Sequence, residues 1–367
     1  MKKTLWYLLA LLGVNFYACK EDESAVQKSE SAITVEWLTD NAGRVDVAAN
    51  GDVWFDRTNQ DGDYRLWQRK GQDESCVSCS YTILGTGHVG NPAVYGNDVL
   101  FQALNTELAI LPAILIPDFK EHSSPGGAIN NELWLYDQQK KQVSKLWSIQ
   151  PGGAVLHPQW GEGGASVLWA EKLKTTANGQ TSGWGEWGVR IASWDSTASR
   201  FNGDPQLIKP GGLQFYETHA LVDGDLYFSG FSFEDESKTL DIYRYSMGSG
   251  TLTNLSASPK EWDEFVHPSP DGKWLAWVSS KDTPQARDRN GNIIKGKFLL
   301  ELWIMRADGS EAKRMSGFNH SGTPEFDARG VVVADFSWGA DSRSVLAKVR
   351  VQQDDILSGE SLRWLRW

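Results

Sequence analysis

The sequence predicts an all-β protein built from repeated four-stranded units, and three observations support this prediction. Short runs of β-branched and aromatic residues alternate with turns rich in Gly, Asn, Asp and Ser, which is typical of many short strands. Long amphipathic helical patterns are absent, and the 367 residues include 18 Trp and 36 Gly. One pair of turns also recurs along the chain, which indicates a repeat architecture.

The repeat is clearest in residues 267–316. This segment contains "HPSPDGKWLAWVSS", a connecting loop, and then "LELWIMRADGSEAKRMS". Pro270 presets φ for a turn and Gly272 supplies its permissive position, while "ADGS" closes a second tight hairpin. The unit resembles the TolB-like propeller repeat, in which one such turn joins strands a and b of a blade and the other joins strands c and d.

Five weaker copies of this unit can be followed along the chain, which makes six blades in total. Their expected first strands begin near Gly43, His88, Ala154, Phe215 and Ala328, and that of the clear copy begins near Trp262. The resemblance therefore implies a six-bladed β-propeller of four-stranded blades. Tryptophans that recur in strands b and c are expected to pack between blades: Trp67, Trp134, Trp169, Trp277 and Trp303.

The sixth blade lacks an outer strand, because the sequence reaches Trp367 on the expected strand c. The segment "ITVEWLTD", residues 33–40, has the pattern of the missing strand. We therefore predict that residues 33–40 pair with residues 361–367 and close the ring. This closure removes two open sheet edges, which would otherwise invite aggregation.

The N-terminal residues have the features of an export signal. Lys2 and Lys3 precede an apolar run over 5–14, which is too short to span a bilayer and suits a signal peptide. With Ala18 before Cys19, the segment resembles a bacterial lipoprotein signal, in which cleavage precedes a lipid-bearing cysteine. The following "KEDES" is similar to the signal that sends lipoproteins of Bacteroidetes-type bacteria to the cell surface. An ordinary signal followed by an incidental cysteine is the alternative.

This resemblance implies three parts of the chain: a signal peptide over 1–18, a polar tether over 19–32, and a propeller domain over 33–367. It also implies lipidation of Cys19. The expected location is therefore outside the cytoplasm, with a lipid anchor in the outer membrane and display at the cell surface.

The other two cysteines are Cys76 and Cys79, in "ESCVSCS". Without a second CxxC or a following His, the spacing does not fit a four-cysteine zinc site or haem attachment. Two neighbouring thiols in an oxidising compartment usually form a disulfide, which we expect here.

The charge of the chain argues against nucleic acid as a partner. The net charge is −11, the pI is about 5.1, and no basic cluster is present. A protein that binds phosphate backbones needs such clusters to release counterions. The expected partners are instead the membrane, through the lipid, and an envelope protein, a peptide or a glycan.

Candidate binding residues gather on the expected innermost strands, which line the channel of a propeller. They are Asn91, His157, His219, His267 and Asp335, with Asp46 at a related position. Imidazole and carboxylate groups that converge on a channel could bind a divalent metal or polarise a substrate. The alternative is that polar side chains line a wet channel and bond to neighbouring backbone.

In TolB-like propellers the b–c connections share one face with the joints between blades. Three long b–c connections are expected here, at about 104–131, 171–186 and 280–298. We therefore expect ligand binding at the channel mouth on that face. Trp184 and Trp187, in "GWGEWG", are candidate aromatic walls, and packing within the third blade is the alternative.

The resemblance favours a binding or scaffold module over an enzyme, because TolB-like propellers are best known for binding proteins and peptides. The GxSxG and HExxH motifs are absent from the sequence. The alternatives are a carbohydrate-active lyase or hydrolase that uses channel His and Asp residues, and a structural envelope protein. No cofactor is expected, and a divalent metal in the channel is the alternative left open.

Overall fold

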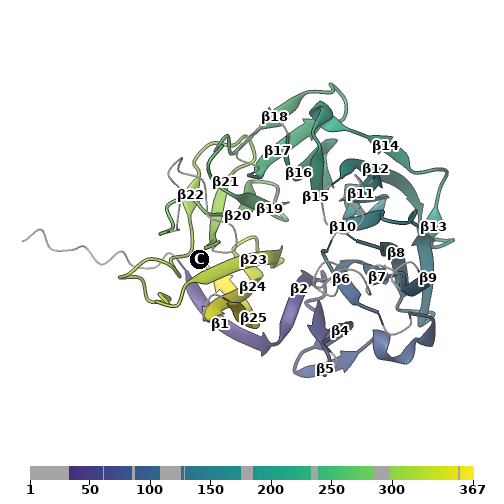
Figure 1. Cartoon of the computed structure of the whole chain (residues 1–367), viewed down its shortest axis with the longest axis horizontal. Helices are drawn as coiled ribbons and strands as arrows, with labels where there is room; N and C mark the ends of the chain where they lie inside the picture. The colour runs from purple at the N-terminus through teal and green to yellow at the C-terminus, as the bar shows by residue number, and fades with distance from the viewer. Residues whose placement is uncertain are drawn as a thin grey trace, which may run out of the picture.

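The computed structural model forms a ring of six antiparallel sheets around a central axis, as Figure 1 shows. It describes residues 33–60, 62–84, 87–107, 125–127, 129–174, 185–232, 239–284, 298–353 and 356–367. The six-bladed β-propeller predicted from the repeat is confirmed. The signal peptide, Cys19 and the tether fall within residues 1–32, outside the described residues.

The strands of each blade occupy four concentric positions, which we call a to d from the channel outwards; blade three has two short strands at position d. Strands a are β2 (Ala42–Val47), β6 (Val89–Tyr95), β10 (Ala154–Gly161), β15 (Phe215–Val222), β19 (Asp263–Pro268) and β23 (Val331–Trp338). Strands b are β3 (Val53–Thr58), β7 (Asp98–Leu104), β11 (Ser166–Lys174), β16 (Asp225–Phe231), β20 (Trp274–Ser279) and β24 (Ser344–Gln353).

The outer half of each blade completes its sheet. Strands c are β4 (Tyr64–Lys70), β8 (Asn131–Asp137), β12 (Glu186–Asp195), β17 (Asp241–Ser246), β21 (Glu301–Arg306) and β25 (Ile356–Arg366). Strands d are β5 (Asp73–Cys76), β9 (Gln142–Trp147), β13 (Arg200–Phe201) with β14 (Gln206–Ile208), β18 (Leu252–Asn254), β22 (Lys313–Arg314) and β1 (Thr34–Asp40). Short 3₁₀ turns lie at Ser78–Ser80, Thr82–Leu84, Glu162–Gly164 and Pro210–Gly212.

The turn between β19 and β20 shows how the sequence specifies a blade. The Ser269 hydroxyl donates to Asp271 Oδ1 at 2.7 Å, and the Ser269 amide donates to the Trp274 carbonyl at 2.8 Å. Gly272 has a φ of 69°, a left-handed conformation that glycine adopts without a steric penalty. The turn therefore fixes the a–b register locally.

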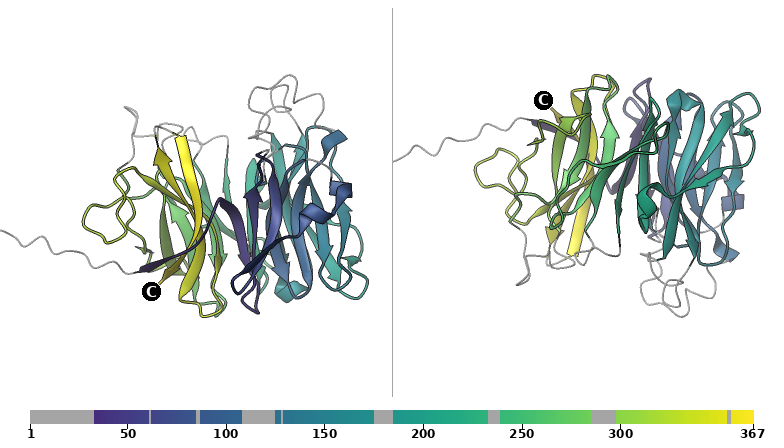
Figure 2. Two further views of the ribbon diagram at one scale, coloured as in Figure 1. Left: turned by 90° about the horizontal axis from the view of Figure 1, so that it is seen from below. Right: turned by 90° about the horizontal axis from the view of Figure 1, so that it is seen from above.

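The ring is closed by the N-terminal strand, as predicted. β1 pairs antiparallel with β25, from Thr34 opposite Arg366 to Asp40 opposite Ser361. The views in Figure 2 show this strand beside the end of the chain. Ile33, which is 7% exposed, belongs to the core between blades five and six. The last blade is therefore held together by noncovalent contacts between the two ends of the propeller.

Tryptophans pack between the blades. Trp169 is fully buried between Trp147 and Phe201, with ring centroids 5.6 Å away in both cases. Trp134, Trp277 and Trp303 are also buried in cores that join neighbouring blades, and Trp67 is half-buried against the core between blades six and one.

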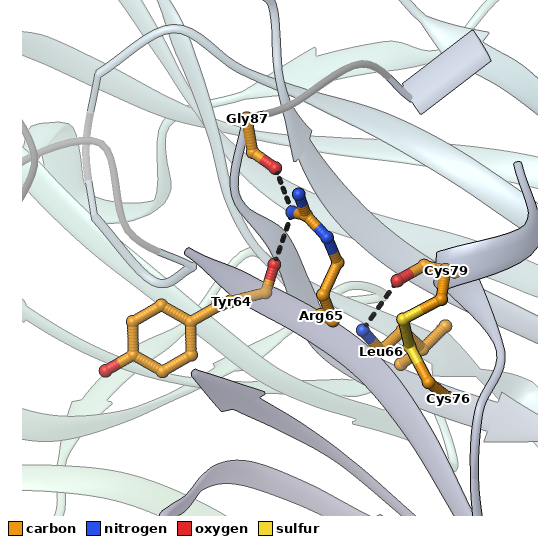
Figure 3. The surroundings of a disulfide bond; sticks show 7 residues. Tyr64, Arg65, Leu66, Cys76, Cys79 and Gly87 are labelled. Atoms are coloured by element: carbon orange, nitrogen blue, oxygen red, sulfur yellow. Dashed lines mark hydrogen bonds between the residues drawn. A yellow bond between two sulfur atoms is a disulfide. The ribbon is translucent and has the colours of Figure 1, made fainter. Parts of the chain in front are cut away.

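Cys76 and Cys79 form a disulfide at the outer edge of the first blade, as Figure 3 shows. The intervening Ser78 accepts a hydrogen bond from the Leu66 amide at 2.9 Å, which ties this turn to β4. On the same strand, Arg65 donates to the carbonyl of Gly87, next to the joint with blade two. The disulfide therefore fastens the end of strand d to the blade.

One further property of the described residues concerns membranes. None of their helices has the length and the apolar character that a membrane crossing would require.

Candidate binding site in the central channel

All six innermost strands are interrupted by a β-bulge near their middle. The register shifts lie between Ala42 and Val45, Gly90 and Ala93, Leu156 and Gln159, Thr218 and Ala220, Glu264 and His267, and Val333 and Phe336. A bulge turns an extra side chain away from the regular alternation and often lies beside a functional site. Asn91, His157, His219 and Asp335 lie within these bulges, and Asp46 and His267 lie at or beside their ends.

Three of the predicted histidines form a row across blades three to five. The ring centroids of His157 and His219 are 5.5 Å apart, and those of His219 and His267 are 5.2 Å apart. Phe265 packs against the first two rings, at 5.5 and 5.8 Å. In the described part of the chain, no group of three or more His, Cys, Asp or Glu side chains is arranged to hold a metal ion.

Burial keeps these histidines neutral. Loss of solvation lowers the pKa of His267 to about 4 and the pKa values of His157 and His219 well below their ordinary value. His219 shares a 3.0 Å hydrogen bond between its Nε2 and the Ser229 hydroxyl. Its Nδ1 is buried and has no hydrogen-bond partner. The row can therefore donate and accept hydrogen bonds but carries little charge at neutral pH.

Acidic side chains face the same channel. Burial raises the pKa of Glu217 well above its ordinary value, and the neighbouring Glu264 raises it further. Burial also raises the pKa of Glu264. Arg44, from the first blade, lowers the pKa values of both, but its own Nε is buried without a hydrogen-bond partner. Glu217 Oε2 likewise lacks a partner.

Two other carboxylates, one buried and one half-buried, hold the ring together. Asp56 accepts the amide of Arg44 in its own blade at 3.0 Å and the amide of Asn91 in the next blade at 2.9 Å. A Cβ added at Gly90 would lie 2.5 Å from the Asp56 side chain, so only glycine permits this approach.

Asp46 joins three blades. Its Oδ2 accepts the Val94 amide of blade two at 2.7 Å, and its Oδ1 accepts the Ser337 hydroxyl of blade six at 2.7 Å. Burial raises the pKa of Asp46 to about 6, although these hydrogen bonds lower it.

The channel opens into a cavity of about 180 Å³. Its lining includes Val222, Pro268 and Trp338, which are terminal residues of three strands a, so it lies at the end of the ring that carries the a–b turns. We call this the a–b end, and the opposite end the b–c end. The polar lining residues are Asp46, Asn91, Gln159, His267, Asp335 and Ser337.

Asp335 is the exceptional residue of this cavity. It is 7% exposed, and it makes no hydrogen bond or ion pair with the described residues. Burial raises its pKa to about 7, and the charges of Arg44 and Lys348 only partly offset this effect. The carboxyl group therefore faces the cavity without a partner for its charge.

The described cavity and the binding face predicted from the sequence lie at opposite ends of the ring, and most residues of the three long b–c connections lie outside the described residues. The predicted mouth was at the b–c end, whereas Asn91, His267 and Asp335 line a cavity at the a–b end. His157 and His219 are each 2% exposed and lie deeper in the channel, not at its entrance. The bulges cause this difference, because they lie well inside the strands and direct these residues into the channel.

The aromatic wall expected from "GWGEWG" is not found at Trp187. This side chain is fully buried between blades three and four and packs against Phe215 at 5.2 Å. The expectation is wrong because its strand position faces the interior. Trp184 lies outside the described residues.

Asn91 lines the cavity, but its side chain is already engaged. Its Nδ2 donates to Gln102 Oε1 at 2.7 Å. The structure therefore gives Asn91 a role in joining strands.

Several channel residues were missed from the sequence, namely Arg44, Asp56, Glu217, Glu264 and Lys348. Glu217 lies two residues before His219, but the bulge between Thr218 and Ala220 breaks the alternation that would place the two side chains on one face. Lys348 comes from strand b, and its ion pair with Glu360, at 3.0 Å, depends on tertiary pairing that the sequence does not display.

Comparison with known proteins gives likenesses of fold. A protein assigned as TolB from Agrobacterium tumefaciens matches at 14% identity, over 76% of this chain and 89% of that chain, with a TM-score of 0.45. Oligogalacturonate lyase from Vibrio parahaemolyticus matches at 10% identity, over 91% of each chain, with a TM-score of 0.47. The β-propeller domain of the trilobed protease from Pyrococcus furiosus matches at 10% identity, over 89% and 84%, with a TM-score of 0.45.

No family model matches the chain, and no curated protein matches it. The class of protein is therefore defined by the fold and the channel themselves. It is a six-bladed β-propeller with a buried, acid-rich channel and a cavity at the a–b end.

Proposed function

We propose that the protein is a binding propeller, held outside the cytoplasm by a lipid on Cys19, that engages a protein or peptide ligand at the a–b end. A basic side chain of the ligand enters the channel cavity and pairs with Asp335. The observation that carries this proposal is a buried carboxyl group that lines a cavity and has no partner among the described residues.

The buried carboxyl group of Asp335 in the cavity lining favours a basic ligand group. Burial is the main cause of the raised pKa of Asp335; Arg44 and Lys348 lower this pKa, whereas Asp56 and Glu264 raise it. A cation close to a buried carboxylate favours the ionised form, and a charge-assisted hydrogen bond between the two groups is stronger than a neutral one.

The geometry of the site also suits binding. Binding sites are usually concave and preformed, with a few polar groups that converge on the ligand. Here the bulges and the hydrogen bonds of Asp46 fix the lining, and Trp338 donates from its indole to the His267 carbonyl at 2.9 Å. Catalysis by a lyase or hydrolase through the channel histidines stays a hypothesis from the sequence, and no observation of the described residues favours it over binding.

The proposed location rests on the N-terminal sequence. Replacement of Cys19 with Ser should release the protein from membranes or leave its signal uncleaved. Fractionation of cells followed by mass spectrometry of the N-terminus measures both effects. Membrane retention with normal cleavage in the Cys19→Ser protein would contradict the anchor.

The binding proposal can be tested by peptide selection. The propeller domain is used to select peptides from a random display library, and the affinities of the recovered peptides are measured by titration. We expect peptides enriched in Lys or Arg, and we expect Asp335→Asn to weaken their binding at least tenfold.

The control for this test is Asp308→Asn, which changes an exposed carboxylate in the c–d turn of blade five, on the same face. This variant should bind as the wild type does. Selection of peptides without basic residues, or equal binding by the Asp335→Asn protein, would refute the proposed site.

A further inference from the structure

A second cavity lies on the same face of the ring, between blades two and three. Its volume is about 720 Å³. It is lined by the a–b and c–d turns of both blades, at residues 95–98, 137–140, 163–165 and 194–199. We call this cavity the groove. It is separate from the channel cavity, because the two share no lining residue.

An aromatic surface forms part of this groove. Tyr95 is 49% exposed and packs against Trp160, with ring centroids 6.0 Å apart. Trp160 in turn meets Trp194 edge-on at 5.3 Å, and Trp194 meets Phe201 at 6.0 Å. The indole of Trp160 is fixed by a 3.0 Å hydrogen bond to the Ala93 carbonyl. The two aromatic residues that line the groove, Tyr95 and Trp194, are therefore held by a packed cluster.

Glycine allows the tyrosine ring to lie against the opposite wall. A Cβ at Gly164 would be 2.0 Å from Cε1 of Tyr95, which is far inside van der Waals contact. A Cβ at Gly163 would come no closer than 4.0 Å to any atom, and that atom is the Tyr95 hydroxyl. Gly164 therefore sets the position of the ring, and Gly163 does not.

Polar groups surround the aromatic surface and are held in place by the turns. Lys140 Nζ pairs with Asp137 Oδ2 at 2.7 Å and donates to the Ser199 hydroxyl at 3.3 Å. The amides of Thr197 and Ala198 each donate to Asp195 Oδ1 at 3.0 Å, which fixes the c–d turn.

The remaining polar groups of the groove can exchange hydrogen bonds with a ligand. Asn97, Gln139, Ser196 and Thr197 line the groove and are exposed. Asp98 also lines it, and burial together with the neighbouring Asp137 raises the pKa of this carboxyl. The lining therefore offers amides, hydroxyls and carboxyls around an aromatic surface.

We infer that this groove binds a neutral oligosaccharide. A sugar ring has an apolar face that packs on a rigid aromatic ring and a rim of hydroxyls that both donate and accept hydrogen bonds. The groove supplies both features. Lys140 forms an ion pair with Asp137. Among the described lining residues, no other Lys or Arg is present to bind a carboxylated or sulfated glycan. This inference is independent of the ligand proposed for the channel.

The test uses the propeller domain and four soluble probes: maltohexaose, cellohexaose, mannohexaose and xylohexaose. Isothermal titration should detect binding of at least one of them at millimolar concentration or below. Tyr95→Ala and Trp194→Ala should each weaken that binding at least tenfold. Phe326→Ala, which removes an exposed aromatic ring outside the groove, should leave it unchanged.

A matched pair of glycine variants distinguishes a local change in the groove from a general loss of stability. Gly163→Ala and Gly164→Ala place the same methyl group at neighbouring positions with φ of 63° and 85°. Only Gly164→Ala should displace Tyr95, so only this variant should lose affinity at least tenfold. Absence of binding for all four probes, or equal binding by the Gly164→Ala and Gly163→Ala proteins, overturns the inference. Asp335→Asn should not affect this binding, so the channel and the groove are tested separately.

Discussion

The spaces between the blades and the channel that the blades enclose are both buried, but they are built from opposite kinds of residue. Between blades two and three, Trp169 is packed among apolar and aromatic side chains. In the channel, Glu217, His219 and Asp335 are each less than 10% exposed. Burial of apolar surface stabilises a fold, whereas burial of an unpaired polar group costs free energy. The ring therefore obtains its stability between the blades, and the channel retains groups suited to binding.

The largest expected effect concerns closure of the ring. Removal of residues 1–40 deletes Ile33 and β1, and so exposes the edge of β25 and part of the core between blades five and six. We expect a loss of several kcal/mol, because a paired strand and its apolar contacts disappear together.

Urea unfolding followed by tryptophan fluorescence measures this loss. The matched control lacks residues 1–30 only and therefore keeps β1. It should unfold at the same urea concentration as the protein that retains residues 20–30. A single unfolding transition of unchanged midpoint after removal of residues 1–40 would show that β1 does not close the ring.

A slightly smaller effect is expected in the core between blades. Trp169→Ala should destabilise the protein by about 3–5 kcal/mol, because it leaves a cavity among Trp147, Phe201 and their neighbours. Phe326→Ala, at a side chain that is 41% exposed, should change the unfolding free energy by less than about 0.5 kcal/mol. Similar losses for the two variants would weaken the contrast between core and surface.

The smallest effect is expected at the outer rim. The Cys76–Cys79 disulfide closes a very short loop, so Cys79→Ser should cost at most about 2 kcal/mol from chain entropy. Mass spectrometry of non-reduced peptides tests for the bond in the protein isolated from cells, and urea unfolding measures its contribution to stability. A loss as large as that of Trp169→Ala would show that the disulfide supports more than the edge of blade one.

The sequence carried enough information to predict the blades and their closure, because the signals are local. The turns at Pro270–Gly272 and Asp308–Gly309, and the strand pattern of residues 33–40, each fix an element through nearby residues. The bulges in the innermost strands are different, since they depend on pairing with strand b. A shift of register changes where every later side chain points. The sequence therefore places His219 and Asp335 in the channel but does not fix their depth: His219 lies deep in the channel, and Asp335 lines the cavity at the a–b end.

The electrostatic environment of the channel carboxylates could not be predicted from the sequence either. The pKa of Asp335 depends on burial and then on Arg44, Lys348, Asp56 and Glu264, which come from three different blades. Their arrangement is a property of the closed ring and has no local signature in the sequence.

If Asp335 is kept for binding, its burial should cost folding stability, and the pH dependence of unfolding measures this cost directly. Its pKa rises from an ordinary value of 3.8 to about 7 in the folded protein. Between these values the folded state holds a proton that the unfolded state has lost, so this group lowers stability as the pH rises from about 4 to about 7. Above pH 7 the full cost is present, and at about 1.4 kcal/mol per pKa unit it reaches at most about 4 kcal/mol.

The measurement is the unfolding free energy of the wild type and of Asp335→Asn at pH 5 and pH 8, by urea titration. The neutral amide avoids the cost of burying a charge, so the variant should be the more stable protein at pH 8, and its advantage should be smaller at pH 5. The same variant should lose affinity for the selected basic peptides. A variant that is less stable than the wild type at pH 8, or equally changed at both pH values, would contradict the claim.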